Sequence, residues 1–269
     1  NGADLRRECL VENVITEEQS GKHHVRGVRV NGRDIGCRAV LSNANLKDTV
    51  ERLLGQSKLP KVFRKFASKV RVNSTSCQVY IGIKKGEAIP EVGDLIFTSE
   101  SKKFSSDELT DRHTTSRTFS IYYPHSRPHL KDPRYSIVAS INAKWKDWDK
   151  LSEEEYIEEK ERLCEESLVA LEKILPGVRD KIDHVEAATP RTIQHYTRHS
   201  GGTSFGTKFE GLEVSEKLPQ HAPGLFHAGS VGIIMSGWLG TINYGVIIAD
   251  KVDRFLHGKF PSDSSSVNT

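Results

Sequence analysis

The sequence predicts an α+β fold, in which strands and helices occur in separate blocks along the chain. Three observations support this prediction. Within residues 9–43, apolar and polar residues alternate on both sides of an Asn31-Gly32 pair. Residues 70–145 contain four more β-rich runs between polar turns. Residues 152–175 then have the pattern of one long amphipathic helix. Grouped strands of this kind favour a mostly antiparallel sheet with flanking helices.

Length, charge and cysteine usage exclude several classes of protein. With 269 residues the chain can form one large domain or two modest ones with a full hydrophobic core. Its 39 basic and 36 acidic residues are interspersed, so the chain has no broad positive electrostatic potential that would favour binding to nucleic acid. The cysteines are widely scattered and form no metal-type spacing, which is typical of reduced thiols in a cytosolic chain. They are Cys9, Cys37, Cys77 and Cys164.

The first elements are the most clearly marked. Asn31-Gly32 supplies the two positive-φ residues of a type I′ turn and therefore predicts a β-hairpin. Apolar residues at helical spacing then predict a helix over 43–55, closed by Gly55 at the C-cap, and a second helix follows at 59–70. Ser152 and Glu155 form a capping-box pattern at the start of the long helix.

The segment from Leu218 to Ala249 contains no Asp, Glu, Lys or Arg, a length sufficient to span a bilayer. It could be a membrane span, a buried strand and helix with a purely structural role, or a cofactor-binding loop. Its six glycines and Pro223 oppose one continuous membrane helix. The pattern instead predicts a buried strand that ends in Gly229 and a helix that begins at Ser236-Gly237. Strand, glycine-rich loop and helix together bring a ligand close to bare backbone at a helix N-terminus.

At this point the residues resemble a family. "GLFHAGSVGIIMSGWLGTINYGVIIADKV" is similar to the C-terminal flavin-binding segment of FAD-dependent oxidoreductases of the phytoene desaturase, carotenoid isomerase and retinol saturase type, within the amine-oxidase-like group. "CLVENVITEE", "VRGVRVNGRDIGCRAVLSNAN" and "TPRTIQHYTRHSGGTSFG" resemble other segments of the same family, in the same order. The resemblance covers nearly the whole chain as the C-terminal half or so of such a protein. It implies FAD as the cofactor and a Rossmann-like FAD domain whose N-terminal βαβ unit this chain lacks, since no G-x-G-x-x-G occurs.

The resemblance also implies which residues hold the cofactor. Gly229 matches the family's glycine at the strand end. Ser230 stands where an acidic or amide residue often contacts the ribityl-pyrophosphate region, so a single hydroxyl replaces that group. The turn Ser236-Gly237-Trp238-Leu239 matches the backbone that approaches the isoalloxazine edge, and Val11 matches the strand residue facing the adenine. The cofactor-binding residues implied are therefore Val11, Gly229, Ser230, Ser236, Gly237, Trp238 and Leu239, with no metal and no catalytic side chain assigned.

The domain organisation follows from the same resemblance. Residues 1–43 and 185–258 are expected in the FAD domain, residues 44–184 in a substrate domain, and residues 259–269 in a disordered, Ser-rich tail. His195, Tyr196 and His199 come just before the glycine-rich segment 200–206 and are expected near flavin and substrate. Packing or surface roles are nevertheless favoured for their side chains. The prolines around His125 and His129 argue against a metal site. "KWKDWD" is expected to pack its indoles inward rather than to form a membrane or partner patch.

Two functions remain open. By resemblance, the parent protein is an FAD-dependent oxidoreductase that desaturates, saturates or isomerises a long apolar polyene or isoprenoid. Such substrates reside in membranes, which implies peripheral membrane contact without a span. The alternative is a non-catalytic isoprenoid-binding or escort protein of the same fold group, a role toward which Ser230 and the missing βαβ unit lean slightly.

Overall fold

A computed structural model describes residues 2–102, 105–127, 131, 133–232 and 237–259. The chain divides into two compact units. The discontinuous unit comprises the described residues of 1–73 and 205–269, and the central unit comprises residues 74–204. Each unit has its own hydrophobic core. Apart from Lys259, the tail that was expected to be disordered lies outside the described residues.

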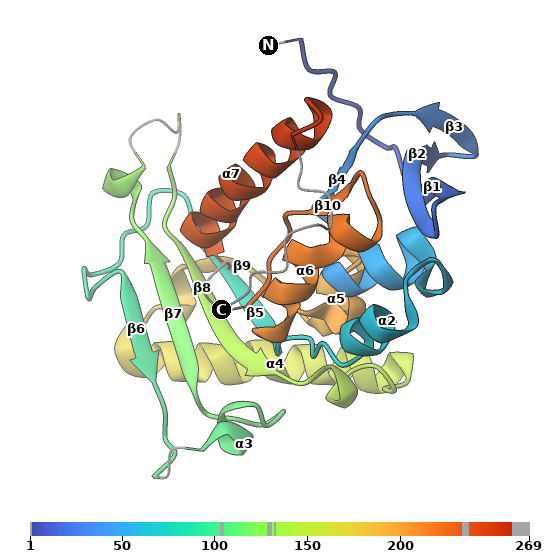
Figure 1. Ribbon diagram of the computed structural model, residues 1–269. Coiled ribbons are helices and arrows are strands. Elements are labelled where there is room, and N and C mark those ends of the chain that lie inside the picture. Colours follow the sequence, from blue (N-terminus) through green and yellow to red (C-terminus); the bar gives the residue numbers. More distant parts are fainter. Residues whose placement is uncertain (1, 103–104, 128–130, 132, 233–236, 260–269) are drawn as a thin grey trace, which may run out of the picture. The chain divides into compact units, whose positions relative to one another are not determined.

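The discontinuous unit contains two small sheets (Figure 1). One is antiparallel with the order β1-β2-β3, and its strands are Val11–Gln19, Lys22–Val30 and Arg33–Gly36. The other pairs two parallel strands, β4 at Val40–Ser42 and β10 at Leu225–His227. The φ angles of Asn31 and Gly32 are 47° and 75°, as a type I′ turn requires. The predicted hairpin is therefore confirmed.

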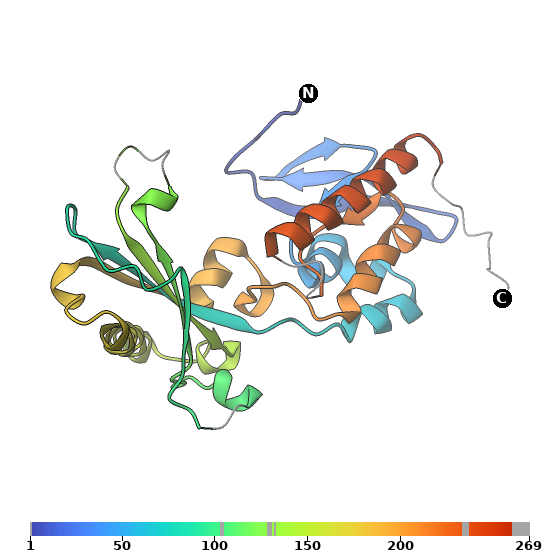
Figure 2. The same ribbon diagram turned by 90° about the vertical axis from the view of Figure 1, so that its left-hand side faces the viewer.

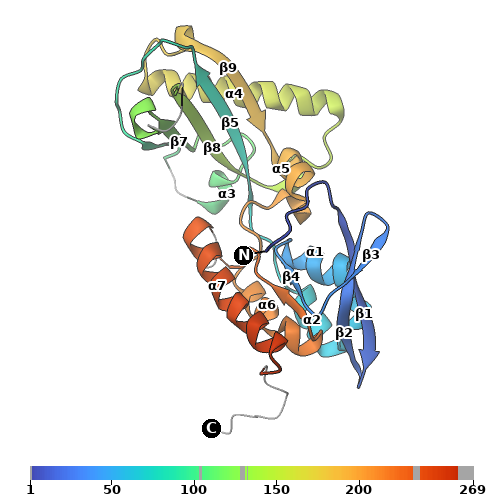
Figure 3. The same cartoon turned by 90° about the horizontal axis from the view of Figure 1, so that it is seen from above.

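The helices of this unit lie within residues 46–68 and 210–256. They are α1 (Leu46–Asp48), which continues as a π-helix (Thr49–Gly55) and a 3-10 turn (Gln56–Lys58), then α2 (Lys61–Ser68), α6 (Glu210–His221) and α7 (Gly237–Leu256). Gly55 has a φ of +90° at the end of its helix, as predicted. Figure 3 shows α7 running beside α6. The sequence did not predict α6, because Gly211 and Pro219 interrupt its pattern, yet Val214 and Leu218 anchor it fully buried in the core.

The boundaries between the units differ from the predicted ones. They fall between Asn73 and Ser74 and between Ser204 and Phe205, rather than after residues 43 and 184. The helices of residues 46–68 belong to the discontinuous unit because their apolar side chains share its core with β10. Strand β9 belongs to the central unit because it pairs along its length with β5.

The central unit is a five-stranded antiparallel sheet with one long helix across it. The strand order is β6-β7-β8-β5-β9, and the strands are β5 (Thr75–Ile83), β6 (Leu95–Thr98), β7 (Arg117–Tyr122), β8 (Ser136–Ala143) and β9 (Ile182–Ala188). Figures 1 and 2 show helix α4 (Glu153–Ile174) lying against one face of this sheet. Alternate strand residues such as Val79 and Phe119 are buried there with Leu171 of α4. The predicted α+β fold with an antiparallel sheet and flanking helices is confirmed.

Shorter helices complete the central unit. They are α3 (Ser106–Leu109), α5 (Pro190–Thr197) and 3-10 turns at Pro124–Ser126, Trp145–Asp147, Arg179–Lys181 and Ser200–Gly202. Trp148 of the "KWKDWD" segment is 1% exposed and Trp145 is half-buried, so the indoles pack inward as expected.

The capping box at the start of α4 provides a first test of how local sequence sets stability. Ser152 Oγ accepts a hydrogen bond from the Glu155 amide at 3.2 Å, and Glu155 Oε2 accepts one from the Ser152 amide at 2.7 Å. We expect Ser152→Ala to lower the free energy of unfolding of the central unit by about 1 kcal/mol. Urea unfolding, followed by the fluorescence of Trp145 and Trp148, measures it. Glu154→Ala, in the same turn but outside the box, serves as the control, and equal losses in both variants would contradict the assignment.

Candidate functional site

The strand that leads into the glycine-rich segment is buried, as the sequence predicted. Leu225, Phe226 and His227 of β10 are 0%, 1% and 0% exposed. Their parallel pairing with β4 is extended by a hydrogen bond from the Ala228 amide to the Ser42 carbonyl oxygen, at 2.9 Å. The chain that follows β10 therefore begins at a fixed position in the core.

Gly229 is required for a close approach between two turns. A Cβ atom added there would lie 2.7 Å from His227 Nε2 and 2.8 Å from the Ala44 carbonyl oxygen. Both distances are shorter than real Cβ contacts, so a side chain would separate β10 from the turn that follows β4. Gly229 thus has a packing role that does not depend on any ligand.

Ser230 lies one residue further along and is held by its backbone. A Cβ atom added at Gly206 would lie 1.9 Å from the Ser230 carbonyl oxygen. Next to this contact, Thr207 forms a parallel bridge with Val231, and the Gly232 amide donates to the Thr207 carbonyl oxygen at 2.9 Å. The loop after β10 is therefore packed against residues 205–207, at the end of the glycine-rich segment 200–206.

The first turn of α7 is exposed. Gly237 has a φ of +69°, and a Cβ atom added there would meet nothing within 4 Å. The side chains of Trp238 and Leu239 are each 87% exposed, and the apolar face continues through Ile242 and Val246 at 61% and 66%. Ser236, the first residue of the predicted turn, lies outside the described residues. The start of α7 thus combines open backbone with uncovered apolar surface.

A buried chain of polar groups joins α7 and α6 to β10. The Tyr244 hydroxyl donates to Ser215 Oγ at 2.7 Å, and Ser215 Oγ lies 2.8 Å from His227 Nδ1. His227 Nε2 lies 2.9 Å from the Ala44 carbonyl oxygen, which can only accept, so Nε2 carries the proton and Nδ1 accepts from Ser215. Ser215, His227 and Tyr244 are at most 1% exposed. The chain fixes the position of α7 relative to the strand.

Burial determines the protonation state of this chain of groups. It lowers the pKa of His227 to about 4, although the hydrogen bond to the Ala44 carbonyl oxygen opposes the shift. Burial also raises the pKa of Tyr244 to about 12, with an opposing effect from the hydrogen bond to Ser215. Both side chains are therefore neutral at pH 7, as a buried chain without a counter-ion requires.

The structure brings together only part of the predicted site. Gly229 and Ser230 share one loop, and Gly237, Trp238 and Leu239 begin the helix that follows it. Val11 opens β1 in the other sheet of the same unit, opposite Val30. Sequence reasoning missed Ser215, His227 and Tyr244 as a linked set, although a histidine inside a charge-free strand was an available signal.

The remaining sequence candidates have ordinary surroundings. His195 and Tyr196 are exposed on α5 in the central unit, with their rings 4.9 Å apart, and His199 Nδ1 lies 3.1 Å from the Thr203 carbonyl oxygen. His125 lies beside Glu91 at 3.5 Å, and His129 is outside the described residues. In the described ranges no group of three or more His, Cys, Asp or Glu side chains could hold a metal ion. Within the same ranges, no helix has both the length and the apolar character needed to cross a membrane.

Comparisons with known proteins show which sequences this chain is similar to. No family model matches the chain. Prolycopene isomerase of Daucus carota is 27% identical over 207 residues, covering 75% of this chain and 32% of that protein. Prolycopene isomerase of Arabidopsis thaliana is 28% identical over 205 residues, covering 75% and 33%. The resemblance to carotenoid isomerases is confirmed.

Solved structures of low identity share the fold. An oxidoreductase from Methanosarcina mazei superposes with a TM-score of 0.55 at 14% identity, covering 90% of this chain and 48% of that one. A proposed protoporphyrinogen oxidase from Exiguobacterium sp. 255-15 gives a TM-score of 0.54 at 13% identity, covering 94% and 47%. The chain spans about a third of the length of the carotenoid isomerases it matches and about half of these two structures.

Proposed function

We propose that this chain is the C-terminal part of an FAD-dependent oxidoreductase or isomerase that acts on a long apolar polyene or isoprenoid. In this proposal the discontinuous unit contributes to the FAD domain and the central unit to the substrate domain. The observation that carries it is the exposed first turn of α7, attached to a buried strand and followed by uncovered apolar residues. The similarity to carotenoid isomerases supports the substrate class.

The residues at the start of α7 fit one edge of a flavin. The first amides of a helix have no intrahelical acceptor and carry a partial positive charge, which suits the oxygen and nitrogen atoms of that edge. Gly237 leaves space beside its backbone, so a planar ring could approach closely. The exposed side chains of Trp238 and Leu239 would cover part of the apolar ring surface. Ser230 would offer its hydroxyl to the ribityl-pyrophosphate region, and Val11 its backbone to the adenine.

The protein and the cofactor would have different tasks. FAD would supply the electron or hydride chemistry. The residues of this chain would bind and orient it: the Tyr244–Ser215–His227 chain fixes α7, and Gly229 and Gly206 allow the loop after β10 to pack closely. A helix N-terminus stabilises an adjacent negative charge by about 0.3–1 kcal/mol. Since about 1.4 kcal/mol corresponds to roughly 30 mV for two electrons, the turn would shift the flavin potential by about 6–20 mV.

A charge placed at the proposed flavin contact tests it. We expect this chain alone to bind FAD weakly, and Leu239→Glu to weaken that binding by about five- to ten-fold, because a carboxylate would lose hydration against the ring. Flavin fluorescence during titration with the protein measures the affinity. Val246→Glu, on the same exposed helix face two turns away, is the matched control. Equal FAD affinities for the two variants would show that the flavin does not contact the start of α7.

The oxidoreductase proposal has its own test. The longest chain that contains this segment should be purified and its visible spectrum recorded. Bound flavin absorbance, followed by a change in double-bond configuration or number in an added polyene, is the expected result. Polyene binding without bound flavin would instead support an isoprenoid-binding or escort protein.

A further inference from the structure

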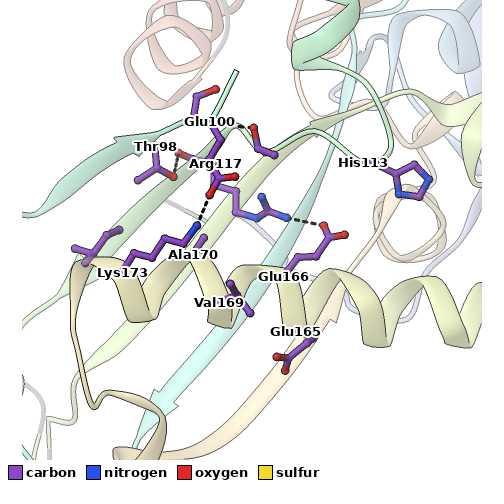
Figure 4. A pocket seen from close by; sticks show the side chains of 12 residues that line it. Thr98, Glu100, His113, Arg117, Glu165, Glu166, Val169, Ala170 and Lys173 are labelled. Atoms are coloured by element: carbon purple, nitrogen blue, oxygen red, sulfur yellow. Dashed lines mark hydrogen bonds and ion pairs between the residues drawn. The ribbon is translucent and has the colours of Figure 1, made fainter. Parts of the chain in front are cut away.

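The central unit contains a cavity of about 490 Å³ between α4 and the ends of β6 and β7 (Figure 4). Its walls come from three stretches of chain: the end of β6 with the residues after it, the start of β7 with the residues before it, and the C-terminal half of α4. The lining residues are Thr98, Ser99, Glu100, His113, Thr115, Arg117, Glu165, Glu166, Val169, Ala170, Lys173 and Ile174. Its volume lies within the range of small-molecule sites.

One wall of the cavity is apolar. Val169, Ala170 and Ile174 lie on the side of α4 that borders it, and Val169 is 44% exposed. Apolar surface left exposed on an otherwise packed helix is stabilised when a hydrophobic group covers it. This wall therefore suits a short hydrocarbon chain.

A buried positive charge from β7 lies against α4 beside this apolar wall. The Arg117 side chain is only 4% exposed, and its guanidinium donates to Glu166 Oε2 at 2.8 Å. Glu166 is shared with Arg162, which also pairs with Glu159, and Glu159 lies 3.8 Å from Arg112. Among the described residues of this cluster, three guanidinium groups therefore share two carboxylates. The Arg117 guanidinium also donates to Ser167 Oγ at 3.4 Å and to the Thr114 carbonyl oxygen at 3.2 Å, so it contributes its charge to the cavity rather than a free hydrogen bond.

A carboxylate of the protein itself lies at the mouth of the cavity. Figure 4 shows Glu100 reaching the Lys173 ammonium group across the opening, and the two side chains form an ion pair. The hydrogen bond and charge of Lys173, and the charge of Arg117, hold the pKa of Glu100 below its usual value. Glu165 does not compete for these cations, because it pairs with Arg179 at 2.7 Å. Both Glu100 and Lys173 are more than half exposed, so their pair is easily exchanged for another.

We propose that this cavity binds an amphipathic carboxylate, whose hydrocarbon chain covers Val169, Ala170 and Ile174 and whose head group replaces Glu100 beside Lys173 and Arg117. A carboxylate is the group that Lys173 already binds in the chain, and the positive charge of Arg117 nearby favours an anion at the same place. The site lies wholly within the central unit and does not depend on the flavin.

The test compares head groups and a blocked cavity in this chain. Octanoate and 1-octanol share the same tail, so we expect octanoate to bind with a dissociation constant on the order of a millimolar and octanol about ten-fold more weakly. Titration followed by the amide NMR signals of residues 169–174 measures both. Ala170→Trp should abolish binding by filling the cavity. Ile157→Trp, at an exposed position of α4 outside the lining, should leave it unchanged.

The variant Glu100→Gln tests whether the Glu100 carboxylate competes with the carboxylate of the ligand, or whether the ligand binds through its hydrocarbon chain alone. Removing the internal carboxylate should strengthen octanoate binding about two- to three-fold and leave octanol unchanged. Circular dichroism spectra that match the unsubstituted chain will show that each variant is folded. Equal affinity for octanoate and octanol, persistence of binding in Ala170→Trp, or no binding of octanoate by any variant overturns the proposal.

Discussion

Replacing Gly206 by alanine will destabilise the discontinuous unit by about 3 kcal/mol or more. Two effects combine at this position. Gly206 has a φ of +65°, which costs a residue with a side chain about 1–2 kcal/mol. The added Cβ would also lie 1.9 Å from the Ser230 carbonyl oxygen, an overlap that forces the backbone apart at about 1–3 kcal/mol. Faster exchange of the Gly232 amide, which donates to the Thr207 carbonyl oxygen beside this contact, measures the local loss.

The hairpin glycine Gly21 provides the matched control. Its φ is +75°, and a Cβ atom added there would meet nothing within 4 Å. Gly21→Ala therefore carries the backbone cost without the clash, and we expect a loss of about 1 kcal/mol. If urea unfolding gives the same loss for both variants, the close packing of Gly206 on Ser230 is not what requires glycine there.

Elements with strong local signals were predictable from the sequence. Asn31-Gly32 is followed by the expected strand pairing, and the Ser152–Glu155 box begins the expected helix. In each case a few adjacent residues determine the conformation. Helix α6 was not predictable in this way, because Pro219 and Gly211 weaken its local pattern and the tertiary burial of residues such as Val214 and Leu218 stabilises it.

In the candidate site, too, local features could be predicted and contacts between distant segments could not. The position of Gly229 after a buried strand could be predicted, because strand and glycine are adjacent in sequence. The Tyr244–Ser215–His227 chain could not, since it joins three elements that no local pattern brings together. The apolar end of the chain suggested burial, yet α7 buries Tyr244 and Ile248 and leaves Trp238 exposed. Helical spacing alone does not say which of two apolar faces meets the core.

Acid will destabilise this protein through His227. Burial holds the pKa of His227 at about 4 in the folded state, whereas an imidazole in an unfolded chain titrates near 6.5. As the pH falls below about 6.5, the imidazole of the unfolded chain binds a proton before that of the folded chain does. The contribution of His227 to the free energy of unfolding is therefore fully present above about pH 6.5 and decreases until about pH 4. The difference between the two pKa values corresponds to a loss of about 3 kcal/mol over that range. Urea unfolding followed by circular dichroism from pH 7 to pH 4 measures it.

His227→Gln isolates this contribution from that of other titrating groups. Glutamine keeps a donor for the Ala44 carbonyl oxygen but cannot take up a proton, so the variant should be less stable at pH 7 and lose less stability on acidification. Tyr244→Phe removes the hydroxyl that donates to Ser215 and keeps the histidine, so its stability should be lower at every pH while the decline stays as steep. A wild-type chain that loses no more stability than His227→Gln between pH 6.5 and 4 would show that His227 is protonated in the folded state. In that case Nδ1 would donate to Ser215 Oγ instead of accepting from it, and the Ser215 hydroxyl would donate to the His227 carbonyl oxygen, 3.1 Å away.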